Sequence, residues 1–351
     1  MTTAPRPLPL WLFALATLAP LGLFALGLWW GGMWPAAALI YMTGFAAALD
    51  QVKGLFIGDA DEAAEFPAAD ALLVAVALAS LALLPCITWA VAGASGLSLA
   101  ARVGMFLAAG LWLGQVANPC AHELIHRTDR LLYRLGVLVY AALLFGHHAS
   151  AHRLVHHVHA ATPDDPNSAR SGEGFYAFAF RAWTGSFRQG YLAEARRRGA
   201  GRLHPYVSYF ALAGASLFAG FWIAGVPGML VWAGLAAHAQ MQLLLSDYVQ
   251  HYGLIRQPLP NGRAEPMAER HSWNAPHWFS AAVMLNAPRH SDHHAHPSRP
   301  YPALRLPGPG DTPHLPWPLP MACTIALFPP LWKRAIRPHL LPWRSQPPET
   351  L

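Results

Sequence analysis

The sequence predicts an all-α integral membrane protein, a bundle of six transmembrane helices with a histidine-rich cap on its cytoplasmic side. Three observations predict this fold. Of the 351 residues, 54% are hydrophobic and only 12% are charged, whereas an ordinary soluble domain has about 25% charged residues. Several uncharged stretches exceed the roughly 20 residues that a helix needs to cross a bilayer. Fifteen of the 19 histidines fall in two short windows, His122 to His159 and His251 to His296.

The uncharged stretches predict three helical hairpins, each broken near its middle by glycine or proline. Two further apolar runs are not counted. Residues 135–145 are too few to cross and suit a re-entrant or interfacial helix, and residues 313–330 carry too many prolines for a helix in lipid. The six predicted spans are residues 9–31, 34–52, 70–93, 100–121, 206–225 and 228–249, in a single domain of residues 1–351.

The distribution of basic residues predicts the orientation. With three tight hairpins, all segments outside the short hairpin turns share one side of the membrane, and they contain every Lys and Arg except Arg102. The positive-inside rule places these segments in the cytoplasm. We therefore expect a protein of a bacterial-type inner or plasma membrane, with both termini and a cap of residues 122–205 and 250–351 in the cytoplasm. The first apolar run continues into a second span, so no cleaved signal peptide is expected.

Charge and cysteine content exclude other classes of protein. The net charge of +6 would suit a nucleic-acid partner, but the high apolar content argues against one, and none is expected. The three cysteines, Cys86, Cys120 and Cys323, form no closely spaced pair. Neither a disulfide framework nor a thiolate metal site is therefore predicted.

The histidines fall at spacings typical of metal ligands on helices. His122 and His126 lie four residues apart at the end of the fourth span, so their rings share one helical face and can reach one ion. The segment His122–His126 also has the H-E-x-x-H pattern of zinc proteases, with Glu123 as the base, but its place at a membrane boundary among many histidines disfavours that interpretation.

Two further clusters repeat this spacing, and a single histidine completes the set. His152 and His156 are four residues apart and His157 is adjacent, able to turn toward a neighbouring ion; His290, His293 and His294 follow the same scheme. His251 ends the sixth span. All four groups lie at the same membrane face in the predicted topology, and imidazole suits iron, copper, zinc and nickel. Nine nitrogens exceed the capacity of one ion, so two metal ions are predicted.

These motifs resemble a known family. H-x3-H, H-x3-H-H and H-x2-H-H resemble the three histidine boxes of the membrane di-iron superfamily of desaturases, hydroxylases and alkane monooxygenases. The strings at residues 161–170 (ATPDDPNSAR), 251–253 (HYG), 271–274 (HSWN) and 289–294 (RHSDHH) resemble more specifically the membrane-bound alkane 1-monooxygenases and the related xylene-type methyl hydroxylases, over roughly residues 35–310.

The resemblance implies two non-haem iron ions, an apolar substrate that enters from membrane lipid, and hydroxylation of a terminal C–H bond with O2 and two external electrons. It further implies rubredoxin or a ferredoxin, with its reductase, as the electron donor. The chain departs from the family pattern at Ala151, at Leu154 and Val155, and at Gln250, beside the ligands. The ligands that the resemblance implies are His122, His126, His152, His156, His157, His251, His290, His293 and His294.

Other residues have expected supporting roles. The nearest carboxylates, Glu123, Asp164, Asp165 and Asp292, are expected to accept hydrogen bonds from ligand rings rather than to bind iron. His147 and His148 are expected to be interfacial or structural, and His159 and His296 to be exposed or to contact the ligands, while His271 or His277 could shape the site. Gly110 and Gly114 form G-x-x-x-G, typical of close helix packing. The predicted wall of the substrate channel is one face of the second span, formed by Leu39, Met42, Thr43, Ala46 and Ala47.

Two alternatives stay open at this stage. The nearer one is a fatty-acyl desaturase or a hydroxylase of another lipid or of an aromatic methyl group. The more distant one is a non-enzymatic metal-handling membrane protein, whose ligands should follow a path through the spans. His238, inside the sixth span, is the one histidine placed for such a path. The sequence leaves open the substrate and its chain length, the identity of the donor and the oligomeric state.

Overall fold

A computed structural model describes residues 6–52, 54–198 and 201–344. Within these ranges the named secondary-structure elements are all helices, as predicted, joined by loops that contain two isolated β-bridges. Lys53, one of the basic residues used for the orientation, lies outside the described residues. The helices in chain order are α1 (Leu10–Trp30), α2 (Trp34–Ile40), η1 (Tyr41–Phe45), α3 (Ala46–Leu49), α4 (Ala69–Ala92), α5 (Leu99–Trp112), η2 (Leu113–Ala117), α6 (Asn118–Ile125), α7 (Arg130–Ala142), α8 (His148–Ala151), η3 (His152–His156), α9 (His157–His159), α10 (Phe175–Arg198), α11 (Pro205–Gln250), η4 (Glu269–His271), α12 (Trp278–Val283), α13 (His290–Ala295), η5 (Tyr301–Ala303), α14 (Leu319–Ala326) and α15 (Pro329–Arg344).

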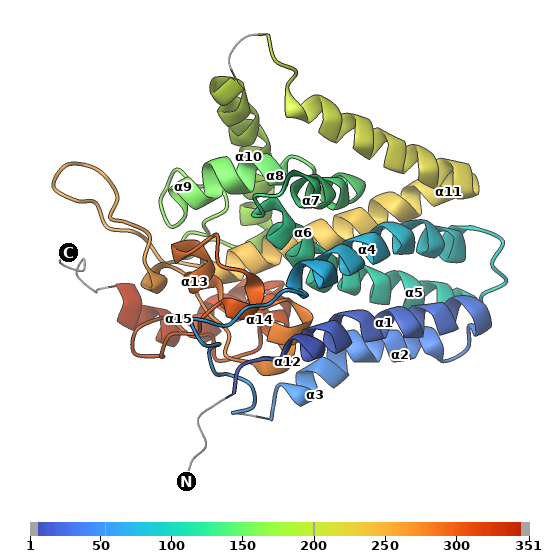
Figure 1. Cartoon of the computed structure of the whole chain (residues 1–351), viewed down its shortest axis with the longest axis horizontal. Coiled ribbons are helices and arrows are strands. Elements are labelled where there is room, and N and C mark those ends of the chain that lie inside the picture. Colours follow the sequence, from blue (N-terminus) through green and yellow to red (C-terminus); the bar gives the residue numbers. More distant parts are fainter. Residues whose placement is uncertain (1–5, 53, 199–200, 345–351) are drawn as a thin grey trace.

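In the described part of the chain, four helices are long and apolar enough to cross a membrane: α1, α4, the continuous run Leu99–Ile125 that includes α5, η2 and α6, and α11. The run Trp34–Leu49, formed by α2, η1 and α3, is apolar but shorter. These helices lie alongside one another in Figure 1, and α4 packs against both α5 and α11. Trp112 is fully buried in this bundle, and its indole N–H donates to the Thr17 carbonyl oxygen at 2.8 Å.

The helix α11 contains two of the predicted spans and turns back on itself between them (Figure 1). The turn is at Ala224 and Gly225, whose backbone is not helical; Gly225 has φ of 61°, a region that only glycine adopts without strain. Beyond the turn, the two halves come very close, because a Cβ on Gly228 would lie 2.2 Å from the Gly220 carbonyl oxygen. Small residues at this crossing thus set the distance between the halves of α11.

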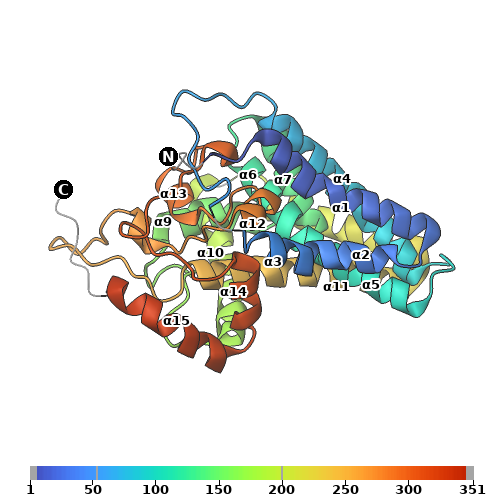
Figure 2. The same cartoon turned by 90° about the horizontal axis from the view of Figure 1, so that it is seen from below.

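Most of the remaining helices lie toward one end of the bundle, whereas α7 packs alongside α6, α4 and α11. Figures 1 and 2 show α9, α13 and α15 together there, at the end where α6 finishes. The apolar run 135–145 falls mostly in α7, which is 13 residues long and packs against α6, and the proline-rich run 313–330 contains the short α14. Both were predicted not to be full spans, and neither helix has the length of one.

Three short π-helical segments interrupt the helices around this end, η1, η2 and η3. A π turn adds one residue to the helical turn and rotates every side chain that follows it. Such segments are frequently found at functional sites. Here they alter which side chains face the interior, with consequences described below.

Candidate metal centre

The nine predicted ligand histidines meet at the end of the bundle, in two groups. One group of five comes from α6, its C-cap, η3, α9 and α13; a group of four comes from η3, the C-cap of α11 and α13. Within each group, one ring nitrogen per residue lies within 4.8 Å of all the others. The group of five is His122, His126, His152, His157 and His293, and the group of four is His156, His251, His290 and His294.

The ring nitrogens approach one another as closely as ligands of one ion. In the group of five, the Nε2 atom of His152 lies 2.8 Å from that of His122, 3.1 Å from that of His126 and 2.9 Å from that of His157. In the group of four, His290 Nε2 is 2.9 Å from His251 Nε2. Imidazole bound at a typical metal–nitrogen distance of about 2.0–2.1 Å, with ligands at right angles, would give separations of about 2.9 Å. The nitrogens are therefore spaced to hold metal ions.

The π turn η3 decides which histidines share a group. The four-residue spacing of His152 and His156 predicts one shared ion, with His157 turned toward another. Instead His152 shares its group with His157, five residues on, while His156 joins the other group. Since the π-helix repeats at i→i+5, it is His157 that lies over His152. One short segment thereby contributes to both groups.

His156 gives the clearest indication of a metal. Its Nδ1 lies 2.8 Å from Asp165 Oδ2, so the ring proton belongs on Nδ1, where it is donated to the carboxylate. Its Nε2 is buried and has no hydrogen-bond partner among the described residues. A buried acceptor of this kind is costly unless something binds it. This atom faces the other three histidines of its group, as a ligand atom would.

Burial keeps most of the cluster neutral, which ligation requires. It lowers the pKa values of His126, His152 and His290 well below the usual range, and nearby imidazoles lower them further. His156 differs. Burial disfavours its cation, but the Asp165 carboxylate outweighs this and raises the pKa of His156. Although burial also opposes ionisation of Asp165, His156 holds the pKa of that carboxyl below its usual range.

The carboxylates expected beside the ligands lie in different surroundings. Glu123 is buried and accepts a hydrogen bond from the Tyr301 backbone N–H at 3.2 Å. Asp292 is fully buried, and contacts Arg299 and, at 3.0 Å, His296 Nδ1 rather than a ligand ring. Asp164 is exposed. Among the contacts of the described residues, Asp165 is the one of these four that hydrogen-bonds a predicted ligand.

A further carboxylate near the cluster was not predicted. Asp247 is buried in the last turn of α11, four residues before His251, and its Oδ2 accepts a hydrogen bond from Asn167 Nδ2 at 2.7 Å. Its charge also acts on His156, whose pKa it raises after the larger effect of Asp165. The i, i+4 spacing from His251 could have revealed it. Nearby Gln250, a departure from the family pattern, donates to the Ala287 carbonyl oxygen at 3.0 Å.

The other histidines lie outside the two groups. His147 packs among Phe145, Trp183 and Phe187, and His148 packs against Tyr140 and Phe145. His271 Nε2 lies 3.0 Å from Glu265 Oε1, in the loop after α11. His159 is partly exposed, His277 precedes α12, and His238 lies in α11 against Phe106.

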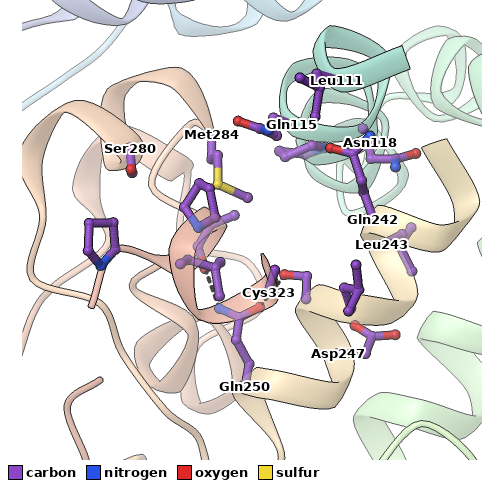
Figure 3. Close-up of a pocket in the computed structure, with 18 of the residues that line it drawn as sticks. Leu111, Gln115, Asn118, Gln242, Leu243, Asp247, Gln250, Ser280, Met284 and Cys323 are labelled. Carbon is purple, nitrogen blue, oxygen red and sulfur yellow. Dashed lines mark hydrogen bonds between the residues drawn. The ribbon is translucent and has the colours of Figure 1, made fainter. Parts of the chain in front are cut away.

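A cavity of about 430 Å³ leads from the apolar helices to the histidines. Its lining includes His122, His152, His290 and His293 at one end (Figure 3 shows part of the wall). Asp50, at the end of α3, accepts hydrogen bonds from the backbone N–H groups of Phe279 and Ser280, which attaches this wall to α12.

The predicted channel face is only partly the cavity face. Met42, Thr43, Ala46 and Ala47 line the cavity, but Leu39 lies in a separate depression with Pro35 and Leu107. The π turn η1 lies between Leu39 and Ala46, so a face counted at 3.6 residues per turn does not continue through it. Part of the wall opposite comes from α14, including Leu319 and Cys323, which the sequence did not indicate.

Comparison with known proteins agrees with this site. Residues 97–307 match the family described as "Fatty acid desaturase", so the histidine cluster lies in a protein of that class. "Alkane 1-monooxygenase 2" of Pseudomonas aeruginosa is 31% identical over 94% of this chain and 91% of its own length, and "Alkane 1-monooxygenase 1" of the same organism is 32% identical over 88% and 83%. The "Xylene/toluene monooxygenase hydroxylase component XylM" of Pseudomonas putida is 27% identical over 66% of this chain and 63% of its own length.

The chain belongs to the alkane 1-monooxygenase family, within the histidine-box superfamily of fatty acid desaturases. The family expected from the histidine motifs is thereby confirmed, and with it an alkane 1-monooxygenase-like hydroxylase with histidine clusters able to hold metal ions. A non-enzymatic metal-handling protein is correspondingly disfavoured, since the histidines gather at one end of the helices instead of along them.

Proposed function

We propose that this protein hydroxylates the terminal C–H bond of alkanes at a di-iron centre held by the nine histidines. The observation that carries the proposal is the pair of histidine groups beside a largely apolar cavity, which four of these histidines line. Similarity to alkane 1-monooxygenases supports iron as the metal and a hydrocarbon as the substrate.

The proposed topology has six crossings. The short run Trp34–Leu49 and the two halves of α11 supply the crossings beyond single passages of α1, α4 and α5–α6. The proposed cytoplasmic side is the histidine end, because the basic residues of the cap favour it. Membrane lipid then surrounds the open part of the cavity wall, and an apolar substrate can enter from it.

The bound iron pair would supply the reaction with O2, in which one oxygen atom enters the C–H bond and the other leaves as water, using two electrons and two protons from outside. The chain contributes binding and position. The apolar wall formed by Met42, Ala46 and Met284 binds the alkyl chain and excludes water. Asp165 fixes the ring of His156 with Nε2 toward its group.

Rubredoxin or a ferredoxin, with its reductase, is the proposed electron source. None of the three cysteines lies in either histidine group, and they do not form a set that could hold an iron–sulfur centre of the chain's own. The two electrons consumed in each turnover must therefore reach the site from a separate carrier.

The test is metal analysis of the purified protein together with alkane-dependent oxygen consumption. We expect two iron ions per chain and terminal alcohol as the product. His156→Ala and His293→Ala, one from each group, should abolish turnover while the protein still inserts in the membrane. Stoichiometric zinc with no iron-dependent activity would refute the proposal.

A second candidate is hydroxylation of an aromatic methyl group, which the similarity to XylM favours. The same assay distinguishes the two when toluene and xylene are included with linear alkanes. Higher kcat/KM for the aromatic substrates would favour this second function, whereas an unsaturated product from a fatty-acyl substrate would indicate a desaturase.

A further inference from the structure

One wall of the cavity carries polar side chains although it is built from membrane helices. His238, Gln242 and Ser246 follow one another in α11 at intervals of four residues, so they share one face of the helix. Gln115 of η2 and Asn118 of α6 line the same cavity (Figure 3). Polar side chains inside membrane helices are costly and usually face a functional cavity.

Two glycines make room for this wall. A Cβ on Gly110 would lie 1.9 Å from His238 Nδ1, and a Cβ on Gly114 would lie 2.1 Å from Gln242 Nε2. The G-x-x-x-G sequence, which alone indicates helix packing, thus accommodates two polar side chains of α11. Any larger residue at either position would displace them.

Helix packing explains only some of these polar groups. Gln242 Nε2 donates to the Gly110 carbonyl oxygen at 2.7 Å, and Asn118 Nδ2 donates to the Ala239 carbonyl oxygen at 2.8 Å, so both connect α5–α6 to α11. Gln115 is 8% exposed, and its carboxamide has no hydrogen bond to any described residue. It projects from η2 into the cavity (Figure 3). A carboxamide that faces the cavity without a protein partner needs a ligand or water to supply one.

Most of the surface that lines the cavity is nevertheless apolar, and Met42, Ala46, Met284 and Leu319 contribute to it. A ligand that complements both the polar and the apolar parts of the cavity wall has an alkyl chain and a polar atom at one position. An unsubstituted alkane would leave the amide of Gln115 without a partner, at a cost that an oxygen-bearing chain avoids.

The distance from Gln115 to the two histidine groups sets the length of the alkyl chain that fits. Gln115 precedes the ligand His122 by seven residues, about 10 Å along a helix. Three successive bonds of an extended chain span about 3.3–3.6 Å. About eight or nine bonds of an alkyl chain therefore cover this distance. A linear chain with one oxygen at its end and about eight carbons fits.

We propose that Gln115 is a substrate-binding residue that hydrogen-bonds the oxygen of an oxygen-bearing alkyl chain, such as a primary alcohol, and directs the far methyl group to the metal centre. This inference rests on the proposed hydroxylase function. The reaction is the same as for an alkane: one atom of O2 enters a C–H bond of the far methyl, the other leaves as water, and the donor supplies two electrons with two protons. The product of 1-octanol is therefore 1,8-octanediol.

The experiment compares 1-octanol with octane on the purified, iron-loaded protein. We expect the wild type to convert 1-octanol to 1,8-octanediol, with oxidation at the distant carbon, and with a higher kcat/KM than for octane. Predominant oxidation at the carbon that already bears the hydroxyl would overturn the proposal, since the oxygen would then lie at the metal end.

Three variants isolate the amide. Gln115→Met keeps the length and approximate volume but removes the hydrogen-bonding atoms, and should lower the ratio of kcat/KM for 1-octanol over octane about three- to tenfold. Gln115→Asn keeps the carboxamide on a shorter side chain, and its ratio should lie between those of the wild type and Gln115→Met. Gln51→Met makes the same change at an exposed glutamine outside the cavity, so it is the matched control and should leave the ratio unchanged. Equal ratios in the wild type and Gln115→Met would overturn the proposal.

A binding readout separates this proposal from the function on which it rests. A ligand that binds the folded state raises the unfolding temperature. 1-Octanol should raise the Tm of the wild type more than octane does, and Gln115→Met should remove that difference. If octane is hydroxylated but the Tm difference is absent, the hydroxylase function stands and the role of Gln115 is wrong. If the difference is present but neither compound is oxidised, the binding role stands and the proposed reaction is wrong.

Discussion

At the scale of single residues, the contact between Asp165 and His156 connects the ATPDDPNSAR motif to the metal centre. Asp165 is fully buried and also accepts a hydrogen bond from Ser168 Oγ at 2.7 Å, so the carboxylate itself is held in place. A ligand imidazole that donates to a fixed carboxylate has one tautomer, one orientation and a more basic ligand nitrogen. The motif therefore has a physical role in the site, although it contributes no predicted ligand.

Asp165→Asn should weaken iron binding about 10–100-fold, because the neutral amide no longer favours the Nδ1 proton of His156. The measurement is the iron retained by the purified protein against increasing chelator. Asp164→Asn is the control, since this neighbour is exposed. Overlapping retention curves for the two variants would mean that Asp165 does not support the ligand.

The spacing of the histidines in the sequence predicts which of them lie close together, but not how they divide into two ligand groups. Rings at i, i+4 on helices that end at one membrane face must lie near one another, and the structure brings all nine together. Their division depends on η3, and a π turn has no periodic signal in apolar or polar patterning. Gln115, the proposed substrate-binding residue, was missed for another reason: a polar residue in a span gives no indication from sequence alone of what it faces.

At the scale of elements, two of the four residues of α3, Ala46 and Ala47, line the cavity near the C-cap residue Asp50. Ala46 is 8% exposed and lines the cavity close to Asp50, whereas Ala48 is exposed outside it. Small side chains at this position leave space for a linear chain. The π turn η1 before α3 leaves fewer of the predicted channel residues on the cavity wall, since Leu39 is not part of it.

Ala46→Trp should shift the products toward shorter substrates, because the indole fills the inner part of the cavity, while the iron content stays normal. The measurement is the product yield across a series of linear alkanes. Ala48→Trp adds the same side chain outside the cavity and should keep the wild-type profile. An unchanged profile for Ala46→Trp would show that this face does not line the channel.

The turn within α11 is a second element that the sequence predicts, from glycine and proline at residues 225–228. The structure adds how closely the two halves approach, which depends on atoms from both. By contrast, α14 could not be assigned to the cavity wall from sequence, since its proline-rich surroundings show no helical period.

Gly228→Ala should destabilise the protein by about 1–3 kcal/mol, because the added methyl must displace the backbone at Gly220. The measurement is Tm in detergent. Gly214→Ala, in the first half of α11, is the matched control, since a Cβ there meets nothing within 4 Å. Equal Tm values for the two variants would contradict the close approach of the halves.

At the scale of the whole molecule, all the elements that carry the histidines converge on one end (Figure 2). Exposed basic residues occur on the helices near that end, including Arg334 and Arg337 of α15 and Arg196 of α10. Composition and hydropathy predict this separation of an apolar bundle from a basic cap, because helices in lipid require apolar side chains and basic residues accumulate in the cytoplasmic segments. They do not predict how loops after residue 250 fold over the cap, which depends on long-range contacts such as that of Arg289 with Asp59.

The electron donor should dock on this basic cap, since small redox carriers are often acidic and charges of opposite sign accelerate encounter. At limiting donor, turnover should fall as salt rises from about 0.01 M to 0.15 M, where the Debye length shortens from about 30 Å to about 8 Å. The measurement is the initial rate of substrate-dependent oxygen consumption. Saturating donor is the control, because encounter then no longer limits the rate and the salt effect should largely disappear. A rate at limiting donor that does not change with salt would mean that the donor recognises another, uncharged surface.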